Sequence, residues 1–147
     1  MKKVLIIAAC VSLWACGNEQ QSVDNTTEQP GTITEQVAEQ TVAQNVDAAA
    51  FSAKLEQEDV QLVDVRTPQE WEQGVIGNPV KANIQAEDFE QKLAELDKNK
   101  PVLVYCASGG RSGRAMQMMK EKGFTEVYNL EGGINTWRQQ DMPVNGN

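Results

Sequence analysis

From residue 48 onward, short apolar runs alternate along the chain with stretches in which apolar residues recur every three to four positions. The runs have the length of buried strands and lie at 60–65, 80–84, 101–105 and 126–130. The stretches between them predict helices over 48–56, 68–73, 87–98 and 112–122, and a last helix through Trp137. We expect Trp71 and Trp137 to face the core. Strands separated by helices of this length favour an α/β fold, with a parallel sheet covered by helices on both faces.

The segment after the first predicted strand carries a helix start signal. Thr67 is an N-cap residue, Pro68 suits the first helical turn, and Glu70 stands in capping-box position. Asp64 and Arg66 immediately precede this turn, and Arg66 is placed to pair with Glu70 across it. We therefore expect Asp64, Arg66 and Glu70 to form a structural polar network rather than to act in catalysis.

The part of the chain before the first predicted helix has a different composition. Residues 17–47 contain six Asp or Glu residues, no Lys or Arg, and no aromatic residue. Such a segment buries too little apolar surface to offset the entropy lost on ordering it. The sequence predicts a flexible acidic linker over 16–45 and one folded domain over 46–145.

The N-terminus has the pattern of an export signal. Two lysines precede an apolar run from Val4 to Ala15, which is too short for a membrane-spanning helix but has the length of a signal peptide. The end of this run, together with Cys16, resembles the lipobox of bacterial lipoproteins. The resemblance implies a signal peptide over 1–15, a lipid anchor on Cys16 and, with Gly17 next to it, a location at the periplasmic face of the outer membrane. The alternative is an ordinary secretory signal or a retained anchor, with Cys16 incidental.

Composition excludes several classes of function. The net charge is −8 and no basic run is present, so the chain has no electrostatic footprint for nucleic acid. It contains no histidine, which excludes Cys–His and Ser–His nucleophile pairs and His-ligated metals. The three cysteines, Cys10, Cys16 and Cys106, match no zinc or iron–sulfur spacing, so we expect neither a metal nor a cofactor. If Cys10 leaves with the signal and Cys16 carries lipid, Cys106 is a single thiol in an exported protein, which suggests a reactive group.

Cys106 follows the most strand-like segment of the chain, at the sheet edge where ligands gather in parallel α/β folds. The loop behind it consists of Ala107, Ser108, Gly109, Gly110, Arg111 and Ser112. The two glycines allow positive φ angles that turn backbone N–H groups inward, and we expect both to do so. The following helix N-terminus and Arg111 add positive charge. These groups favour a thiolate, or a persulfide anion, without any general base. We therefore predict that Cys106 is the nucleophile and that residues 107–112 bind its substrate.

Three segments in this order resemble a single-domain rhodanese. They are Asp-Val-Arg-Thr-Pro-Gln-Glu-Trp at 64–71, Tyr-Cys-Ala-Ser-Gly-Gly-Arg-Ser at 105–112, and Tyr-Asn-Leu-Glu-Gly-Gly-Ile-Asn-Thr-Trp at 128–137, followed by Pro-Val at 143–144. The resemblance implies a rhodanese-like fold, with a five-stranded parallel sheet between helices. It also implies a sulfurtransferase that moves sulfane sulfur from thiosulfate or a persulfide donor to a thiol or cyanide acceptor, through a persulfide on Cys106. The chain departs from the family at Val75, where rhodaneses usually carry histidine.

The implied partners are small sulfur anions, thiol acceptors, and a membrane that the lipid anchor reaches. We expect no nucleic-acid partner, and we expect the domain to act as a monomer. Two other functions remain open. Dual-specificity phosphatases of the cell-cycle type share this architecture, but they place five residues between Cys and Arg, whereas four separate Cys106 from Arg111 here. The other is a noncatalytic binding module tethered to a membrane, against which the retained nucleophile and glycines argue.

Overall fold

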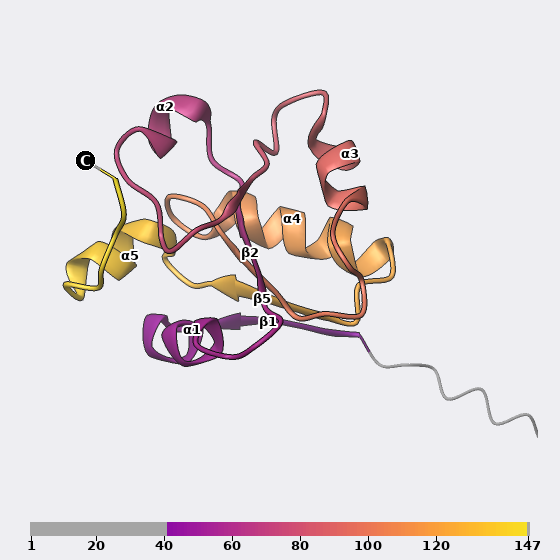
Figure 1. The fold of residues 1–147 in the computed structure, drawn as a ribbon, viewed down its shortest axis with the longest axis horizontal. Coiled ribbons are helices and arrows are strands. Elements are labelled where there is room, and N and C mark those ends of the chain that lie inside the picture. The colour runs from indigo at the N-terminus through magenta and orange to yellow at the C-terminus, as the bar shows by residue number, and fades with distance from the viewer. Residues whose placement is uncertain (1–40, 147) are drawn as a thin grey trace, which may run out of the picture. The chain divides into compact units, whose positions relative to one another are not determined.

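A five-stranded sheet, parallel throughout, forms the centre of the computed structural model, which describes residues 41–146 (Figure 1). The predicted signal peptide, Cys16 and most of the predicted linker lie outside the described residues. The strands are β1 (Val42–Val46), β2 (Gln61–Asp64), β3 (Val80–Lys81), β4 (Val102–Tyr105) and β5 (Glu126–Leu130). Their order across the sheet is β1-β5-β4-β2-β3. Within the described part of the chain, no helix is long and apolar enough to cross a membrane.

Helices cover both faces of this sheet, which confirms the predicted fold class (Figure 1). The helices are α1 (Ala48–Leu55), α2 (Pro68–Trp71), α3 (Phe89–Ala94), α4 (Gly110–Glu121) and α5 (Gly133–Gln139). One core cluster joins the sheet to α3 and α4 through residues such as Leu93 and Met119. The other joins the opposite face to α1 and α5 through Phe51 and Trp137, whose rings meet edge to face at 6.1 Å.

Strand β4 lies between β5 and β2 and is buried along its whole length. Its residues alternate between the two clusters, since Val102 and Val104 belong to one and Leu103 and Tyr105 to the other. Burial on both faces is what a continuous apolar run in a parallel sheet requires. The strand therefore delivers the next residue, Cys106, from a fixed position to the carboxyl edge of the sheet.

Strand β1 was not predicted, and it corrects the end of the linker predicted over 16–45. It pairs with β5 in parallel, in a register that runs from Val42 opposite Glu126 to Val46 opposite Leu130. The strand lies at the sheet edge, and all its residues are exposed or only half-buried. Backbone pairing, with partial burial of Ala43 and Val46 against the two clusters, holds it in place, so its sequence lacks the apolar run that marks the inner strands.

Several other boundaries and one side chain also differ from the prediction. Helix α3 is shorter than the predicted 87–98, because turns flank it on both sides, with Phe89 N–H bonded to Ala86 and Leu96 N–H bonded to Leu93. Trp137 is buried as expected, whereas Trp71 is only half-buried, under the ammonium group of Lys81 at 5.7 Å from its ring centre. These differences leave the carboxyl edge of the sheet unchanged.

A chain that begins at Asp47 lacks β1 and leaves the edge of β5 unpaired. We expect its thermal unfolding midpoint to lie at least about 5 °C below that of a chain that begins at Thr41, because the lost pairing corresponds to about 1 kcal/mol or more. Circular dichroism melting of both chains measures the difference. Equal midpoints would show that β1 contributes nothing to the stability of the domain.

Candidate active site

Cys106 lies directly after β4, fully buried between the end of the strand and the start of α4. The backbone N–H of Gly109 donates a hydrogen bond to Cys106 Sγ over 3.1 Å. The thiol sulfur is thus already in contact with a backbone donor of the loop that follows it. Among the described residues Cys106 is a free cysteine.

The loop depends on Gly109 more than on Gly110. Gly109 has a φ of +88°, and a side-chain carbon there would lie 3.1 Å from both the nitrogen of Gly132 and the carbonyl oxygen of Leu130. Gly110 is the first residue of α4, and a side-chain carbon there meets open space. The expectation that both glycines adopt positive φ angles is therefore wrong for Gly110, because the helix already begins at that residue.

The turn between β5 and α5 holds this loop through hydrogen bonds to the carbonyl groups of the loop. At the start of α5, Ile134 N–H donates to Cys106 O over 2.9 Å and Asn135 N–H donates to Ala107 O over 3.1 Å. Asn129, which is buried at the end of β5, donates from its amide to Gly109 O over 3.1 Å. None of these three residues was predicted from the sequence to belong to the site. The signal that was available is the Gly-Gly pair after β5, where Gly133 approaches the carbonyl of Cys106 too closely for any side chain.

Electrostatics at the sulfur result from two opposed effects. Burial disfavours the charged form of Cys106, but hydrogen bonds from the Ser112 hydroxyl and from the backbone N–H groups of Ser112, Ser108 and Gly109 together outweigh it. The pKa of the Cys106 thiol is therefore lowered. The pKa of the Arg111 guanidinium is raised chiefly by its hydrogen bonds to Glu70, and the nearby Cys106 thiolate contributes to the same rise. The site thus favours a thiolate without a neighbouring base.

Arg111 makes a contact that the sequence did not predict. Its Nη1 and Nη2 atoms donate to the two carboxylate oxygens of Glu70 over 2.8 and 2.6 Å. Both side chains are about three-quarters buried. The hydrogen bond from Arg111 is the main reason that the pKa of Glu70 falls to about 2. A salt bridge thus connects the thiol loop to α2.

The expected pairing of Arg66 with the Glu70 side chain is wrong, because a closer carboxylate is available. Arg66 binds Asp64 through Nε and Nη2, with the shortest contact at 2.6 Å, and both residues are buried. Its guanidinium also donates to the backbone carbonyls of Glu70 over 3.0 Å and Gly74 over 2.8 Å. The predicted structural polar network is present with these different partners, and it fixes the backbone that carries Glu70.

The predicted loop residues differ in how open they are. Cys106, Gly109 and Ser112 are buried, Ala107 and Arg111 are half-buried, and Ser108 and Gly110 are exposed. Ser108 borders a hollow of about 520 Å³, whose lining includes Asp47, Glu131 and Thr136. The loop therefore has a buried sulfur and an accessible rim. In residues 41–146, no group of three or more His, Cys, Asp or Glu side chains is arranged to hold a metal ion.

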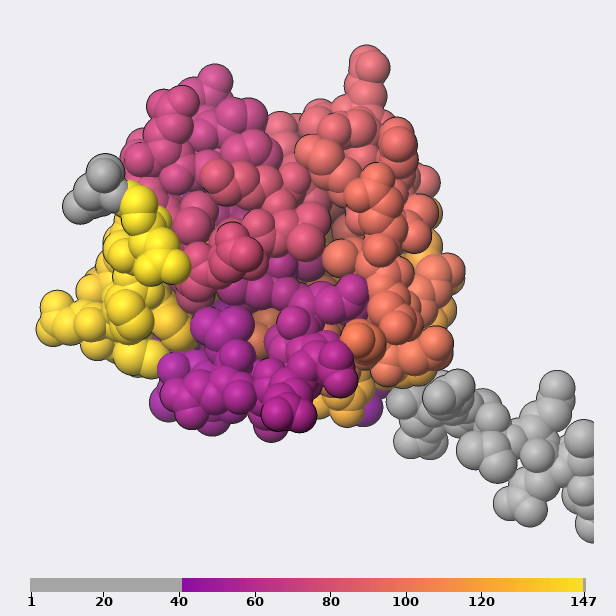
Figure 2. Space-filling view, in the orientation of Figure 1, coloured from indigo at the N-terminus to yellow at the C-terminus, as the bar shows by residue number. Residues whose placement is uncertain are grey.

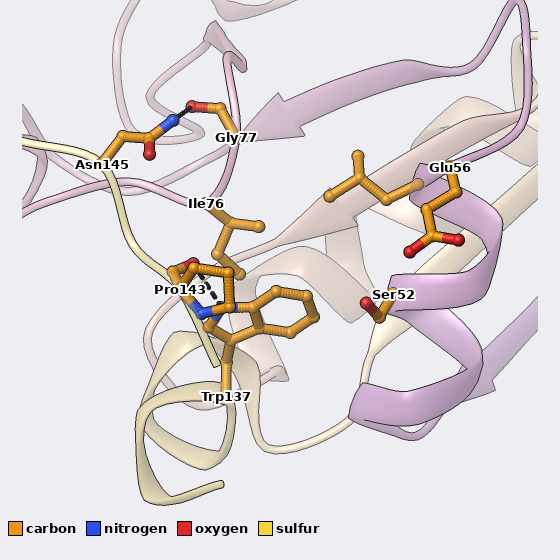
Figure 3. Close-up of a pocket in the computed structure, with 8 residues that line it drawn as sticks. Ser52, Glu56, Ile76, Gly77, Trp137, Pro143 and Asn145 are labelled. Atoms are coloured by element: carbon orange, nitrogen blue, oxygen red, sulfur yellow. Dashed lines mark hydrogen bonds between the residues drawn. The ribbon is translucent and has the colours of Figure 1, made fainter. Parts of the chain in front are cut away.

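A second hollow, of about 220 Å³, contains none of the loop residues (Figure 3). It lies between α1 and the C-terminal segment, with Ile76 and Trp137 at its base. The C-terminal segment lies against the chain between α2 and β3 (Figure 2), where Val75 and Asn145 exchange backbone hydrogen bonds of 2.8 and 2.7 Å. The backbone of Val75, the residue that departs from the rhodanese pattern, thus pairs with the C-terminal segment, and the side chain takes no part in these bonds.

Comparison with known proteins gives the family. Residues 47–140 match the rhodanese-like domain. The chain is 35% identical over 100 residues to a sulfurtransferase from Allochromatium vinosum, over 67% of this chain and 92% of that protein. It is 34% identical over 100 residues to the thiosulfate sulfurtransferase GlpE from Vibrio cholerae, over 68% of this chain and 92% of that protein. A rhodanese-related protein from Thermoplasma volcanium has a similar structure, with a TM-score of 0.62 and 29% identity over 69% of this chain and 97% of that one.

The chain therefore belongs to the family of rhodanese-like domains. The names of these relatives support an enzyme of the sulfurtransferase type. In the segment that resembles rhodaneses, Cys106 stands where the family carries its nucleophile, and the structure buries this residue with its sulfur 3.1 Å from the backbone nitrogen of Gly109.

The lowered pKa of Cys106 can be tested by measuring how fast the thiol is alkylated at different pH values. Ser112→Ala removes a hydroxyl that donates to the Gly109 carbonyl oxygen over 3.2 Å and that contributes to lowering the pKa of Cys106. We expect the midpoint of the iodoacetamide alkylation rate against pH to rise by about one pH unit, because a hydrogen bond to a charged group contributes about 1.5 kcal/mol or more. At a pH below both midpoints, the variant will react more slowly. Ser108→Ala is the matched control, because Ser108 acts through its backbone N–H, which the substitution keeps. The same midpoint in all three proteins would contradict the assigned role of Ser112.

Proposed function

We propose that this protein is a sulfurtransferase that carries sulfane sulfur as a persulfide on Cys106. The observation that supports the proposal most strongly is the backbone N–H of Gly109, which lies 3.1 Å from Cys106 Sγ inside a loop of inward-facing donors. Such a loop stabilises a sulfur anion by hydrogen bonds alone, which suits a chain without histidine. Relatives named sulfurtransferase and thiosulfate sulfurtransferase support the same reaction class.

The transfer takes place in two balanced steps. In the first step, the Cys106 thiolate attacks the outer sulfur of thiosulfate, an S–S bond forms between Cys106 Sγ and that sulfur, and the S–S bond of the donor breaks with its electron pair leaving on sulfite. The enzyme then holds Cys–S–S⁻, whose charge equals that of the starting thiolate. In the second step, an acceptor thiolate attacks the outer sulfur, forms its own persulfide and releases the Cys106 thiolate. A persulfide donor enters in the same way, with a thiolate as leaving group.

Each part of the site supplies one requirement of this cycle. The loop N–H groups that lower the pKa of the thiol also stabilise the outer sulfur anion, which extends from the buried Cys106 toward the exposed rim at Ser108 and Gly110. Arg111, which is paired with Glu70, places a guanidinium beside the sulfur. The hydrogen bonds from Ile134 and Asn135 keep the loop in the same conformation while a sulfur atom passes from donor to acceptor.

The spacing in the loop argues against the phosphatase alternative. Four residues separate Cys106 from Arg111, and the last of these, Gly110, is already the first residue of α4. The loop is thus short enough to surround one sulfur atom, whereas the phosphatase loop is one residue longer and surrounds a tetrahedral phosphate. The noncatalytic alternative conflicts with the lowered pKa of the Cys106 thiol, which a binding module does not need.

The proposed location follows from the chain outside the described residues. A lipid on Cys16 anchors the domain at the periplasmic face of the outer membrane, and the acidic linker lets the domain act as a monomer at a distance from the bilayer. Its acceptors are then thiols of the envelope, and its donors are small sulfur anions in the same compartment.

Treatment of the purified protein with thiosulfate tests the reaction. We expect intact-protein mass spectrometry to show a gain of one sulfur atom on wild-type chain, and none on Cys106→Ser, because serine forms no persulfide. Addition of cyanide should remove the gain and release thiocyanate. A wild-type thiol that acquires no sulfur from thiosulfate, a thiosulfonate or a small-molecule persulfide would contradict the proposed function.

The anchor has a separate test in cells that make the full chain. We expect a labelled fatty acid to be incorporated into wild-type protein and not into Cys16→Ala, because the thioether position is lost. Cys106→Ser is the matched control and should incorporate the label normally. Equal labelling of wild type and Cys16→Ala would place the lipid elsewhere, and no label in either would contradict the anchor.

A further inference from the structure

Glu70 competes with any anionic donor for Arg111. The carboxylate engages both terminal nitrogens of the guanidinium, over 2.8 and 2.6 Å, which is the bidentate geometry that Arg also uses for sulfur and phosphorus oxyanions. A donor that approaches the buried Cys106 thus meets a cation whose best hydrogen-bonding edge is already occupied. The other charges on α2 and in the loop do not change this, since Glu72 at the end of α2 is exposed.

Glu70 is itself held in position from several sides. Its Oε2 atom accepts from the backbone N–H of Thr67 over 2.9 Å and from the Thr67 hydroxyl over 3.0 Å. Its backbone carbonyl accepts from the buried guanidinium of Arg66 over 3.0 Å. With a pKa of about 2, the carboxylate stays charged at any working pH. The structure therefore fixes a permanent negative charge beside Arg111.

We propose, on the basis of the proposed function, that Glu70 is a positioning residue that sets donor selectivity by neutralising Arg111. The neutral Glu70–Arg111 pair attracts a doubly charged donor little more than a singly charged one. The Glu70 carboxylate also repels the second charge of the donor. The site therefore favours singly charged donors, such as hydropersulfides and thiosulfonates, over the thiosulfate dianion. Without Glu70, the free guanidinium reverses this preference.

Two donors with the same reactive sulfur and different charge test the proposal. Thiosulfate carries two negative charges and releases sulfite, whereas benzenethiosulfonate carries one and releases benzenesulfinate, and both leave the same persulfide on Cys106. The measured quantity is the ratio of kcat/KM for thiosulfate to kcat/KM for benzenethiosulfonate, obtained from persulfide formation on the full chain. The ratio cancels any general loss of active protein.

We expect Glu70→Gln to raise this ratio roughly tenfold, the size expected when one extra donor charge meets an uncompensated guanidinium near the protein surface. Glutamine is accepted in a capping box, so α2 keeps its N-cap. Glu72→Gln is the matched control, because it removes one exposed negative charge at the C-cap of the same short helix, and it should leave the ratio unchanged. A ratio that stays constant or falls in Glu70→Gln would overturn the proposal.

Arg111→Ala and the double variant Glu70→Gln/Arg111→Ala distinguish an effect of the Glu70 charge on the donor from a purely structural effect of Glu70 on the loop. Arg111→Ala leaves Glu70 uncompensated and should lower the ratio, whereas the double variant removes both charges and should return the ratio close to wild type. A double variant that behaves like Arg111→Ala would mean that Glu70 only braces the loop. If wild type loads no sulfur from either donor, the proposed function fails. If it loads sulfur and the ratios do not move as stated, only the role of Glu70 fails.

Discussion

The close approach of two backbone turns holds the reactive loop in shape. Gly109 has a positive φ and lies against Leu130 and Gly132, while the first N–H groups of α5 bond to the carbonyls of Cys106 and Ala107. Any side chain at Gly133 would collide with those carbonyls, so α5 could not reach them. Asn135 binds the carbonyl of Ala107, and the N–H of the same peptide, that of Ser108, is one of the donors that lower the pKa of Cys106.

This arrangement explains how a fully buried cysteine has a lowered pKa. Burial alone raises the pKa of a thiol, and an apolar site would leave Cys106 inert. Hydrogen bonds from Ser112, Ser108 and Gly109 reverse the balance. The persulfide proposed as the intermediate has the same charge as the thiolate, so one set of donors serves both states. The Glu70–Arg111 salt bridge adds a guanidinium close to the sulfur, and Glu70 compensates its charge.

The sequence predicted those parts of the molecule that a continuous segment encodes. Cys106, the positive φ of Gly109 and the inner strands follow from local patterns, because each depends on residues within a few positions. The Glu70–Arg111 pair joins residues 41 positions apart in the sequence. Arg66, the partner expected for Glu70, binds the Asp64 carboxylate instead. Strand β1 escaped prediction because edge pairing needs no apolar run. Asn129 and Ile134 support the loop from a turn that folding alone brings near it.

The central claim is that the Gly109 N–H binds the sulfur anion on Cys106, and the amide resonance of Gly109 reports on it directly. We predict that the ¹H and ¹⁵N shifts of this amide titrate with pH, with a midpoint below the ordinary thiol pKa of about 8.5. They should move again, without a change in pH, when thiosulfate loads the thiol. In Cys106→Ser, both responses should disappear. A Gly109 amide that titrates at or above the ordinary thiol value, or that stays unchanged when the persulfide forms, would contradict the account.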